Sequence, residues 1–237
     1  MRRNEIKFTL ILILVISSGI FYYKISDKEI NLNQAQVIKV IDGDTIETNI
    51  GKIRLLGINS PEKSMPNYNE AKIFLNNLLN NETIKVETIH GNEIDKYSRI
   101  LGHVYLDEVY INKEIIKNGF ANLYYYEKDS HYNELKEAEE FAIKNNLGIW
   151  KKSNNFGCLK LIKLKFKENK QCNNEEVLVL NNTCQKLKVL IKDNANHIFK
   201  EDINSGIFSK NFSCVWNDEG DRILIWDDNG RVFVYSF

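Results

Sequence analysis

A group of acidic and basic residues in the first half of the chain has the types and spacing that phosphate chemistry needs. Asp42 and Asp44 share one tight turn, and two neighbouring carboxylates can hold a hard divalent cation through oxygen. Arg54 and Arg99 can grip a phosphate from different sides, because guanidinium groups match its oxygens and stay charged. Glu62 follows a proline and can act on water. Together these residues predict metal-assisted phosphodiester cleavage.

Each of these features also has a structural explanation when it is taken alone. Acidic turns are common in loops, an arginine on a strand is usually solvated or ion-paired, and a glutamate after a proline often starts a helix. The joint pattern, with all of these groups in one segment, favours the chemical interpretation.

The surrounding residues predict a small domain in which helices are inserted into a sheet. Short apolar runs between turns predict strands within residues 37–58 and over 83–89, 100–106 and 108–111. Helical spacing of apolar residues predicts helices over 69–80, 112–118 and 131–146. The predicted class of this domain is therefore α+β.

From residue 154 onward the helical spacing disappears, and the pattern predicts an all-β second domain. Short alternating runs cover residues 159–166, 176–180, 187–191, 212–216, 222–226 and 231–235. The sequence Asp227-Asp228-Asn229-Gly230 between the last two runs is a strong hairpin signal.

The amino terminus has the order of charges that is typical of a secretory signal or a signal anchor. Three basic residues precede the uncharged run 8–23. As a helix this run would span about 24 Å, short of the roughly 30 Å hydrocarbon core, so cleavage and anchoring both remain open. We expect a hydrophobic helix over 1–24 and a polar tether over 25–35. The predicted location is the cell membrane, as a single-pass protein with extracellular domains, or the secreted fraction.

Four cysteines lie in the last third of the chain, and none falls in the C-x-x-C pairs that zinc sites use. An even number of cysteines in an exported protein favours two disulfides, with three possible pairings. Buried free thiols are the alternative if the protein is not exported. The candidate disulfide cysteines are Cys158, Cys172, Cys184 and Cys214.

Composition and charge exclude several classes of protein. The 237 residues are 43% hydrophobic and 27% charged, which excludes a wholly disordered chain and a polytopic membrane protein. The 32 Lys and Arg balance 32 Asp and Glu, so any binding of a polyanion must be local. Residues 36–153 hold 15 Lys and Arg against 18 Asp and Glu, and a cation would offset part of this acidity, so we expect binding of nucleic acid to depend on metal and to weaken with added salt.

Residues 36–153 resemble the thermonuclease family, of which staphylococcal nuclease is the best-known member. The resemblance covers half of the chain and rests on four motifs in order: V-I-D-G-D-T, R-L-L-G-I-N-S-P-E, D-K-Y-S-R-I-L-G-H-V-Y and L-G-I-W. It implies an OB-fold, a five-stranded β-barrel with three helices.

The resemblance also implies a site for one calcium ion (Ca2+). Asp44 would be a direct ligand, Asn59 would stand at the second ligand position beside the backbone carbonyl of Ser60, and Asp42 would act through water. The family usually has aspartate where this chain has Asn59. A neutral amide oxygen removes one charge and weakens the affinity for the cation.

The catalytic roles follow from the same motifs. Glu62 matches the proposed general base or water-orienting residue, while Arg54 and Arg99 match the pair that binds the scissile phosphate and stabilises its transition state. Ser98 replaces a usual glycine before Arg99, which matters if that backbone needs a positive φ.

Four further residues lie where the family contacts the nucleotide. Any base can stack on a tyrosine ring, so such contacts do not depend on the sequence of the nucleic acid. The alternative role for these rings is ordinary packing in half-buried strands. The predicted substrate-binding residues are Lys96, Tyr97, Tyr124 and Tyr126.

Residues 154–237 resemble the lamin-tail type of immunoglobulin-like β-sandwich. The resemblance rests on E-E-V-L-V-L-N-N, L-K-V-L-I-K-D-N-A and W-N-D-E-G-D-R-I-L-I-W-D-D-N-G. A binding or spacing role is the default for such a module, and its ligand does not follow from the resemblance.

The sequence as a whole predicts an exported, calcium-dependent, thermonuclease-like endonuclease that hydrolyses DNA and RNA, with single strands preferred. Its N-terminal segment would contact the membrane, and no protein partner is inferred. A non-catalytic nucleic-acid-binding OB-fold and a cell-surface binding module are the alternatives.

Overall fold

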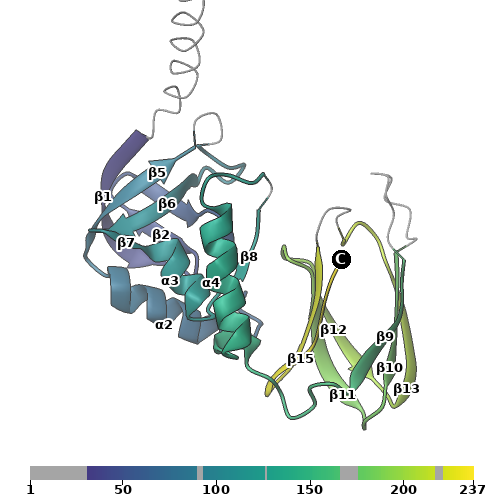
Figure 1. Ribbon diagram of the computed structural model, residues 1–237. Coiled ribbons are helices and arrows are strands. Elements are labelled where there is room, and N and C mark those ends of the chain that lie inside the picture. The colour runs from purple at the N-terminus through teal and green to yellow at the C-terminus, as the bar shows by residue number, and fades with distance from the viewer. Residues whose placement is uncertain (1–30, 90–92, 126, 166–175, 217–220) are drawn as a thin grey trace, which may run out of the picture.

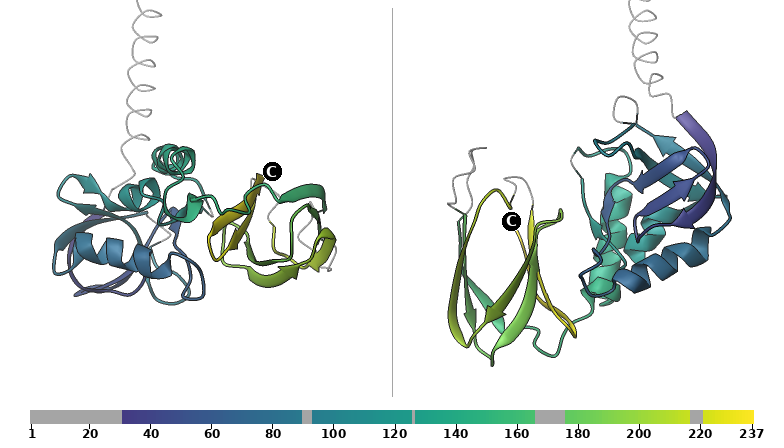
Figure 2. Two further views of the ribbon diagram at one scale, coloured as in Figure 1. Left: turned by 90° about the horizontal axis from the view of Figure 1, so that it is seen from below. Right: turned by 180° about the vertical axis from the view of Figure 1, so that it is seen from behind.

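The structure of the chain is a computed structural model that describes residues 31–89, 93–125, 127–165, 176–216 and 221–237. The predicted N-terminal hydrophobic helix lies outside these residues. Within them, every helix is too short or too polar to cross a membrane. Figure 1 and the two views in Figure 2 show a barrel with helices lying beside a strand-rich part, with a short connection after helix α4.

The first part is a closed barrel, as predicted. Strands β1 and β2, β2 and β3, β1 and β5, and β5 and β6 pair antiparallel, and β3 pairs parallel with β6 to close the ring. The barrel strands are β1 (Asn31–Val40), β2 (Thr45–Thr48), β3 (Gly51–Leu55), β5 (Thr83–Thr88) and β6 (Ile100–Leu106).

Shorter elements extend the barrel and cover its ends. The strand β7 (Val109–Tyr110) pairs with β6, while β4 (Ile58–Asn59) pairs with β8 (Asn122–Leu123). The three helices match the predicted positions to within two residues at each end. They are α2 (Tyr68–Leu79), α3 (Ile111–Lys117) and α4 (Tyr132–Lys144).

The apolar residues whose spacing predicts these helices lie on the face that each helix buries. Ala71, Leu75 and Leu79 of α2 are fully buried, and Leu75 and Leu79 share one core with barrel residues such as Ile46 and Ile53. Burial of each large aliphatic side chain contributes about 2 kcal/mol. The helices are therefore held by the barrel, and the barrel strands by the helices.

The predicted tether over 25–35 is too long, because β1 already begins at Asn31. Its first six residues pair with β5, from Asn31 opposite Thr88 to Gln36 opposite Thr83. The side chains of Asn33 and Gln34 are exposed, so this half of the strand lacks the apolar alternation that would have indicated it. Backbone pairing with a neighbouring strand, which a sequence pattern does not record, places it in the barrel.

The second part is all-β, as predicted, and consists of two antiparallel sheets over one core. One sheet has the order β13 (Gly206–Phe212), β10 (Glu176–Asn182) and β9 (Leu159–Lys165). The other has the order β12 (Ile198–Ile203), β11 (Leu187–Lys192), β14 (Arg222–Asp227) and β15 (Gly230–Ser236). The resemblance to a lamin-tail domain stays a prediction.

Two details of this part differ from the prediction. The expected strand over 212–216 is wrong, because β13 ends at Phe212 and Cys214 has a positive φ of 52°. Strands β12 and β13 were not predicted, since β12 buries only Ile203 and carries polar residues in its middle. The hairpin at 227–230 is confirmed by the pairing of Asp227 with Gly230.

A disulfide joins Cys158 to Cys184, with Cα atoms 5.4 Å apart. Cys214 is also disulfide-bonded, and Cys172 lies outside the described residues. The prediction of disulfides over metal-bound thiols is therefore confirmed for Cys158, Cys184 and Cys214.

The two parts pack against each other through a shared apolar cluster and a buried ion pair. Arg222 of β14 makes a bidentate ion pair with Glu139 of α4, at 2.8 and 2.7 Å, and Trp226 donates its indole N–H to the Ile149 carbonyl at 2.8 Å. The buried members of the cluster are Met65, Ala142, Ile149, Trp150, Leu224 and Trp226. The domains therefore form a continuous interface on the side of α4 and β8 (Figure 1).

Candidate active site

The turn between β1 and β2 brings the carboxylates of Asp42 and Asp44 together, next to Ser60 at the start of the loop after β4. Asp42 accepts a hydrogen bond from the backbone N–H of Asp44 at 3.1 Å, and Asp44 accepts one from the N–H of Ser60 at 2.7 Å. Gly43 makes this close approach possible, since a Cβ at that position would lie 2.7 Å from the Cβ of Ser60. The sequence D-G-D thus positions its acids against the N-S-P-E motif.

Arg54 connects the acidic turn to Asn59. Its position in β3 lies opposite Thr45, the first residue of β2 after the turn. Its Nε lies 3.2 Å from Asp44 Oδ1, and its terminal nitrogen donates to Asn59 Oδ1 at 3.2 Å. The predicted residues Asp44, Arg54, Asn59 and Ser60 therefore form one hydrogen-bonded group.

The electrostatics of the turn suit a cation. Burial and the neighbouring charge of Asp44 raise the pKa of Asp42 to about 6. The raised pKa reflects first the burial of Asp42 and then repulsion between the two carboxylates. A divalent cation would offset this repulsion, and the oxygen donors of Asp42, Asp44 and the Ser60 carbonyl are the type that calcium takes.

Glu62 extends into solvent from the loop that follows Ser60. Its side chain is exposed, while its carbonyl accepts a hydrogen bond from the N–H of Met65 at 2.7 Å. Met65 is buried in the cluster between the domains, so it anchors the loop. Glu62 is thus two residues from Ser60 on a loop that is fixed at both sides, with a carboxylate that water can reach.

Arg99 is positioned by a carboxylate to which the sequence analysis gave no role. Asp95 Oδ2 lies 2.7 Å from both Nε and a terminal nitrogen of Arg99, and Asp95 Oδ1 accepts from the Arg99 N–H at 3.0 Å. Burial alone would raise the pKa of Asp95, but these hydrogen bonds hold it below its usual value. The four-residue spacing of Asp95 and Arg99 within one turn is the sequence signal that could have predicted this ion pair.

The backbone of this turn has the positive φ at Ser98 that would explain why the family usually has glycine at this position. Ser98 has a φ of 60°, in the left-handed region that favours glycine. The turn is closed by hydrogen bonds from the Asp95 N–H to the Arg99 carbonyl at 2.9 Å and from the Ser98 N–H to the Asp95 carbonyl at 3.0 Å.

The barrel places Arg54 near the turn that carries Arg99. Arg54 of β3 lies beside Leu101 in the parallel pair of β3 and β6. Arg99 is the last residue of the turn before β6, which begins at Ile100. A phosphate between them could be reached from both sides.

The predicted nucleotide-binding residues have different surroundings. The Tyr97 side chain is exposed, at 66%, with the Lys96 ammonium 5.0 Å and the Arg99 guanidinium 5.4 Å from its ring centre. Tyr124 is half-buried, and its N–H donates to the Gly57 carbonyl at 3.0 Å. Tyr126 lies outside the described residues. Of the two predicted tyrosines that the structure describes, Tyr97 has the exposed ring beside cations that base stacking needs.

The C-terminal domain reaches this site, which the sequence did not indicate. The Asn59 amide nitrogen lies 3.2 Å from the Asn194 carbonyl, 2.6 Å from the Ala195 carbonyl and 2.9 Å from Asn196 Oδ1. Lys192 donates to Asn122 Oδ1 at 3.1 Å. These partners are some 70 to 137 residues apart in the chain, so no local pattern could have found them.

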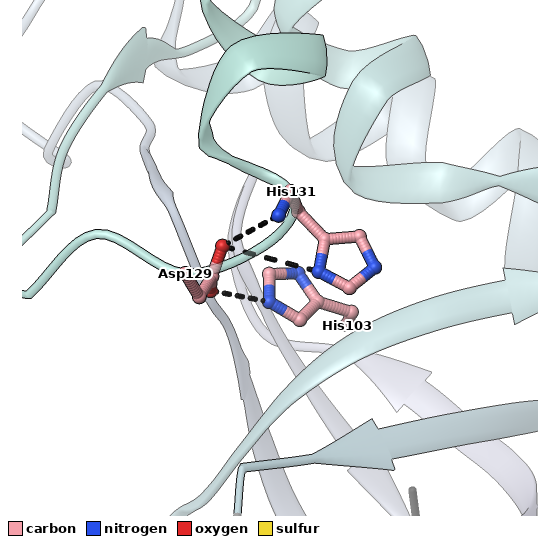
Figure 3. A group of neighbouring side chains, drawn as sticks. All are labelled: His103, Asp129 and His131. Atoms are coloured by element: carbon pink, nitrogen blue, oxygen red, sulfur yellow. Dashed lines mark hydrogen bonds and ion pairs between the residues drawn. The ribbon is translucent and has the colours of Figure 1, made fainter. Parts of the chain in front are cut away.

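A second cluster of potential metal ligands, separate from the predicted calcium ligands, consists of His103, Asp129 and His131 (Figure 3). Its ring nitrogens already have partners. His103 contacts Asp129 at 2.8 Å and the Tyr110 hydroxyl at 2.6 Å. The two imidazole rings stack with centres 3.9 Å apart, so their in-plane lone pairs cannot converge on one ion. We assign this cluster to the packing of α4 against the barrel.

Comparisons with known proteins agree with this geometry. A family model described as staphylococcal nuclease homologue matches residues 52–152. The chain is 33% identical over 126 residues to a thermonuclease of Staphylococcus hyicus, a match that covers 48% of this chain and 74% of the relative. The chain belongs to the staphylococcal nuclease family.

Two further relatives are endonucleases of Bacillus subtilis (strain 168). This family member is 33% identical to the SPbeta prophage-derived endonuclease YokF over 127 residues, which are 48% of this chain and 43% of the relative. It is 33% identical to endonuclease YncB over 138 residues, 51% of this chain and 65% of the relative. The matches therefore span from less than half to three quarters of these relatives.

Proposed function

We propose that this member of the staphylococcal nuclease family is a calcium-dependent endonuclease that hydrolyses phosphodiester bonds of DNA and RNA. The observation that carries the proposal is the hydrogen-bonded group of Asp44, Arg54 and Ser60, with Arg99 in the turn that leads into β6, the parallel partner of the Arg54 strand. The names endonuclease and thermonuclease of its relatives support the same reaction.

One calcium ion would be held by Asp42, Asp44 and the Ser60 carbonyl. When bound, it would polarise a phosphate oxygen and offset the negative charge of substrate and carboxylates. The approach of two carboxylates in one turn, with Asp42 accepting from the Asp44 N–H at 3.1 Å and Asp44 accepting from the Ser60 N–H at 2.7 Å, supports this placement.

The residues of the chain divide the remaining work. Arg54 and Arg99 bind the oxygens of the scissile phosphate and stabilise the charge that develops there, a contribution of about 3–4 kcal/mol for each such donor. Glu62, which is exposed on the loop two residues after Ser60, takes a proton from the attacking water as general base. Asp95 is a positioning residue that fixes the Arg99 guanidinium.

The substrate is a nucleic acid strand read without base specificity. Tyr97 offers an exposed ring on which any base can stack, and Lys96 adds a positive charge beside it. Unpaired bases can reach such a ring and paired bases cannot, so we propose a preference for single strands. Tyr124 and Tyr126 are proposed as further contacts to the nucleotide.

The proposed location is outside the cytoplasm, either secreted or held at the cell membrane by the N-terminal segment. The basic residues and the uncharged run 8–23 support export. The disulfide between Cys158 and Cys184 supports an oxidising compartment. Fractionation of the producing cells, with detection of the C-terminal domain, separates a membrane-bound form from a released one.

A cleavage assay on the full chain tests the reaction and the metal together. Single-stranded DNA and RNA are incubated with calcium, with magnesium or with a chelator, and the products are separated on a gel. The proposal expects internal cleavage of both substrates with calcium and none with chelator. Intact substrates in all three conditions would contradict it.

A non-catalytic nucleic-acid-binding barrel is the second candidate, and the buried Asn59 favours it. The side chain at this predicted ligand position is neutral and engaged by the C-terminal domain. This alternative predicts binding that persists with chelator and yields no products.

A further inference from the structure

The C-terminal domain meets the candidate site through the loop between β11 and β12, which we call the docking loop (residues 193–197). Three oxygen atoms of this loop surround the Asn59 amide nitrogen at 2.6 to 3.2 Å. All three are hydrogen-bond acceptors, so the group between them must be a donor. A carboxylate at position 59 would place an oxygen against these three acceptors and be repelled.

The docking loop is held in shape by its own domain. The buried Asp193 accepts from the His197 N–H at 3.1 Å and contacts His197 Nδ1 at 2.6 Å. Asp221 accepts from the Asn194 N–H at 3.0 Å. The carbonyls that receive the Asn59 amide are therefore fixed before the two domains meet.

A second contact between the domains is made by Asn122 on β8, the strand that pairs with β4. Asn122, paired with Asn59 between β8 and β4, donates to the Asn194 carbonyl at 3.0 Å and accepts from Lys192 at 3.1 Å. Lys192 is 1% exposed. The charges that face its ammonium include Glu62 and Asp44 of the candidate site, together with Asp193 and Asp221 of its own domain.

Both ends of the Asn59 amide are in use. The oxygen accepts from Arg54 at 3.2 Å, the nitrogen faces the docking loop, and the residue is 2% exposed. We propose that Asn59 is a docking residue and not a calcium ligand, and that it anchors the C-terminal domain so that the docking loop forms a wall of the active site. The statement that Asn59 is not a calcium ligand rests on the proposed function, whereas the docking role does not.

Hydrogen exchange in the full chain without calcium tests the docking role. Asn59→Asp should speed exchange of the amides of residues 193–197 at least tenfold, because the carboxylate repels the three acceptors. Asn196→Ala removes one acceptor from the other side of the contact and should speed the same amides several-fold. Asn77→Asp, at an exposed position of α2, makes the same charge change elsewhere and should leave them unchanged.

Two results would overturn the docking role. One is unchanged exchange of the docking loop in both Asn59→Asp and Asn196→Ala. The other is equal acceleration in Asn77→Asp, which would make the effect a general response to charge.

Calorimetric titration with calcium tests the second half of the proposal. If Asn59 is not a ligand, Asn59→Ala should bind calcium within threefold of the wild type, and calcium should leave the docking-loop exchange of the wild type unchanged. A tenfold weaker affinity in Asn59→Ala, or loss of loop protection on adding calcium, would overturn it. A wild type that binds no calcium would refute the proposed function, while the exchange experiment would still decide the docking role.

Discussion

At the scale of single residues, the turn that carries Arg99 combines a functional contact with backbone strain. Ser98 has a φ of 60°, and a side chain in this region costs about 1 kcal/mol relative to glycine. We predict that Ser98→Gly raises the free energy of unfolding by about 0.5–1 kcal/mol. Urea denaturation of the two full-length proteins measures the difference.

The matched control at this position is Ser98→Ala, which removes the hydroxyl but keeps a Cβ. It should leave the stability unchanged or lower it slightly. A stabilisation by alanine equal to that by glycine would show that the hydroxyl, and not the backbone conformation, is responsible.

Sequence reasoning found the residues whose chemistry is local. Asp42 and Asp44 share a turn, and Arg54 follows within the same strand meander, so spacing alone predicted that they meet. Asn59 was found by its motif, but its contacts lie 135 to 137 residues further along the chain. Such contacts arise from the packing of one domain on another, which a motif does not encode.

At the scale of elements, β11 ends in a buried lysine whose charge has a measurable cost. Burial lowers the pKa of Lys192 to about 8, whereas an unfolded lysine titrates near 10.5. Between these values the unfolded chain holds a proton that the folded chain has released, so stability should rise with pH by up to about 1.4 kcal/mol per unit. Below pH 8 both states are charged and the contribution is flat.

Denaturation at pH 7.5, 8.5 and 9.5 tests this prediction when wild type and Lys192→Met are compared. The difference between them should grow in favour of the wild type as the pH rises, since the other groups titrate alike in both. Lys188→Met on the same strand is the control, because Lys188 is exposed. A constant difference across the three pH values would contradict the prediction for Lys192.

Strands and helices whose apolar residues recur at a regular spacing were predicted from the sequence. Strands with few buried side chains, which form because a neighbouring strand supplies backbone hydrogen bonds, were not. β6 was expected over 100–106 and occupies those residues, because its apolar side chains line the barrel. β12 and β13 have mostly half-exposed or exposed side chains, so their sequences resemble loops. Their partners β11 and β10 supply the hydrogen bonds that make them strands.

At the scale of the whole molecule, the ion pair between Arg222 and Glu139 joins the domains. The Glu139 side chain is 2% exposed, and Leu123 also donates its N–H to it at 2.7 Å. Removing Arg222 leaves a buried carboxylate without its counter-charge, which typically costs about 3–5 kcal/mol. We predict that Arg222→Ala lowers the free energy of unfolding by this amount in urea denaturation.

The control for this prediction is an exposed ion pair in the same domain. Lys186 and Asp202 lie 2.7 Å apart with side chains 53% and 51% exposed, so Lys186→Ala should cost less than about 1 kcal/mol. Equal losses in Arg222→Ala and Lys186→Ala would mean that the interface does not hold the domains together.

In the proposed mechanism, Glu62 acts as general base on water that attacks a phosphate bound by Arg54 and Arg99. The most direct measurement is the calcium-dependent rate of cleavage of single-stranded DNA by the full chain, with Glu62→Gln compared with Glu70→Gln at an exposed position of α2. We predict a loss of about 10²–10⁴-fold for Glu62→Gln and an unchanged rate for Glu70→Gln. A Glu62→Gln protein that cleaves at the wild-type rate would contradict the account.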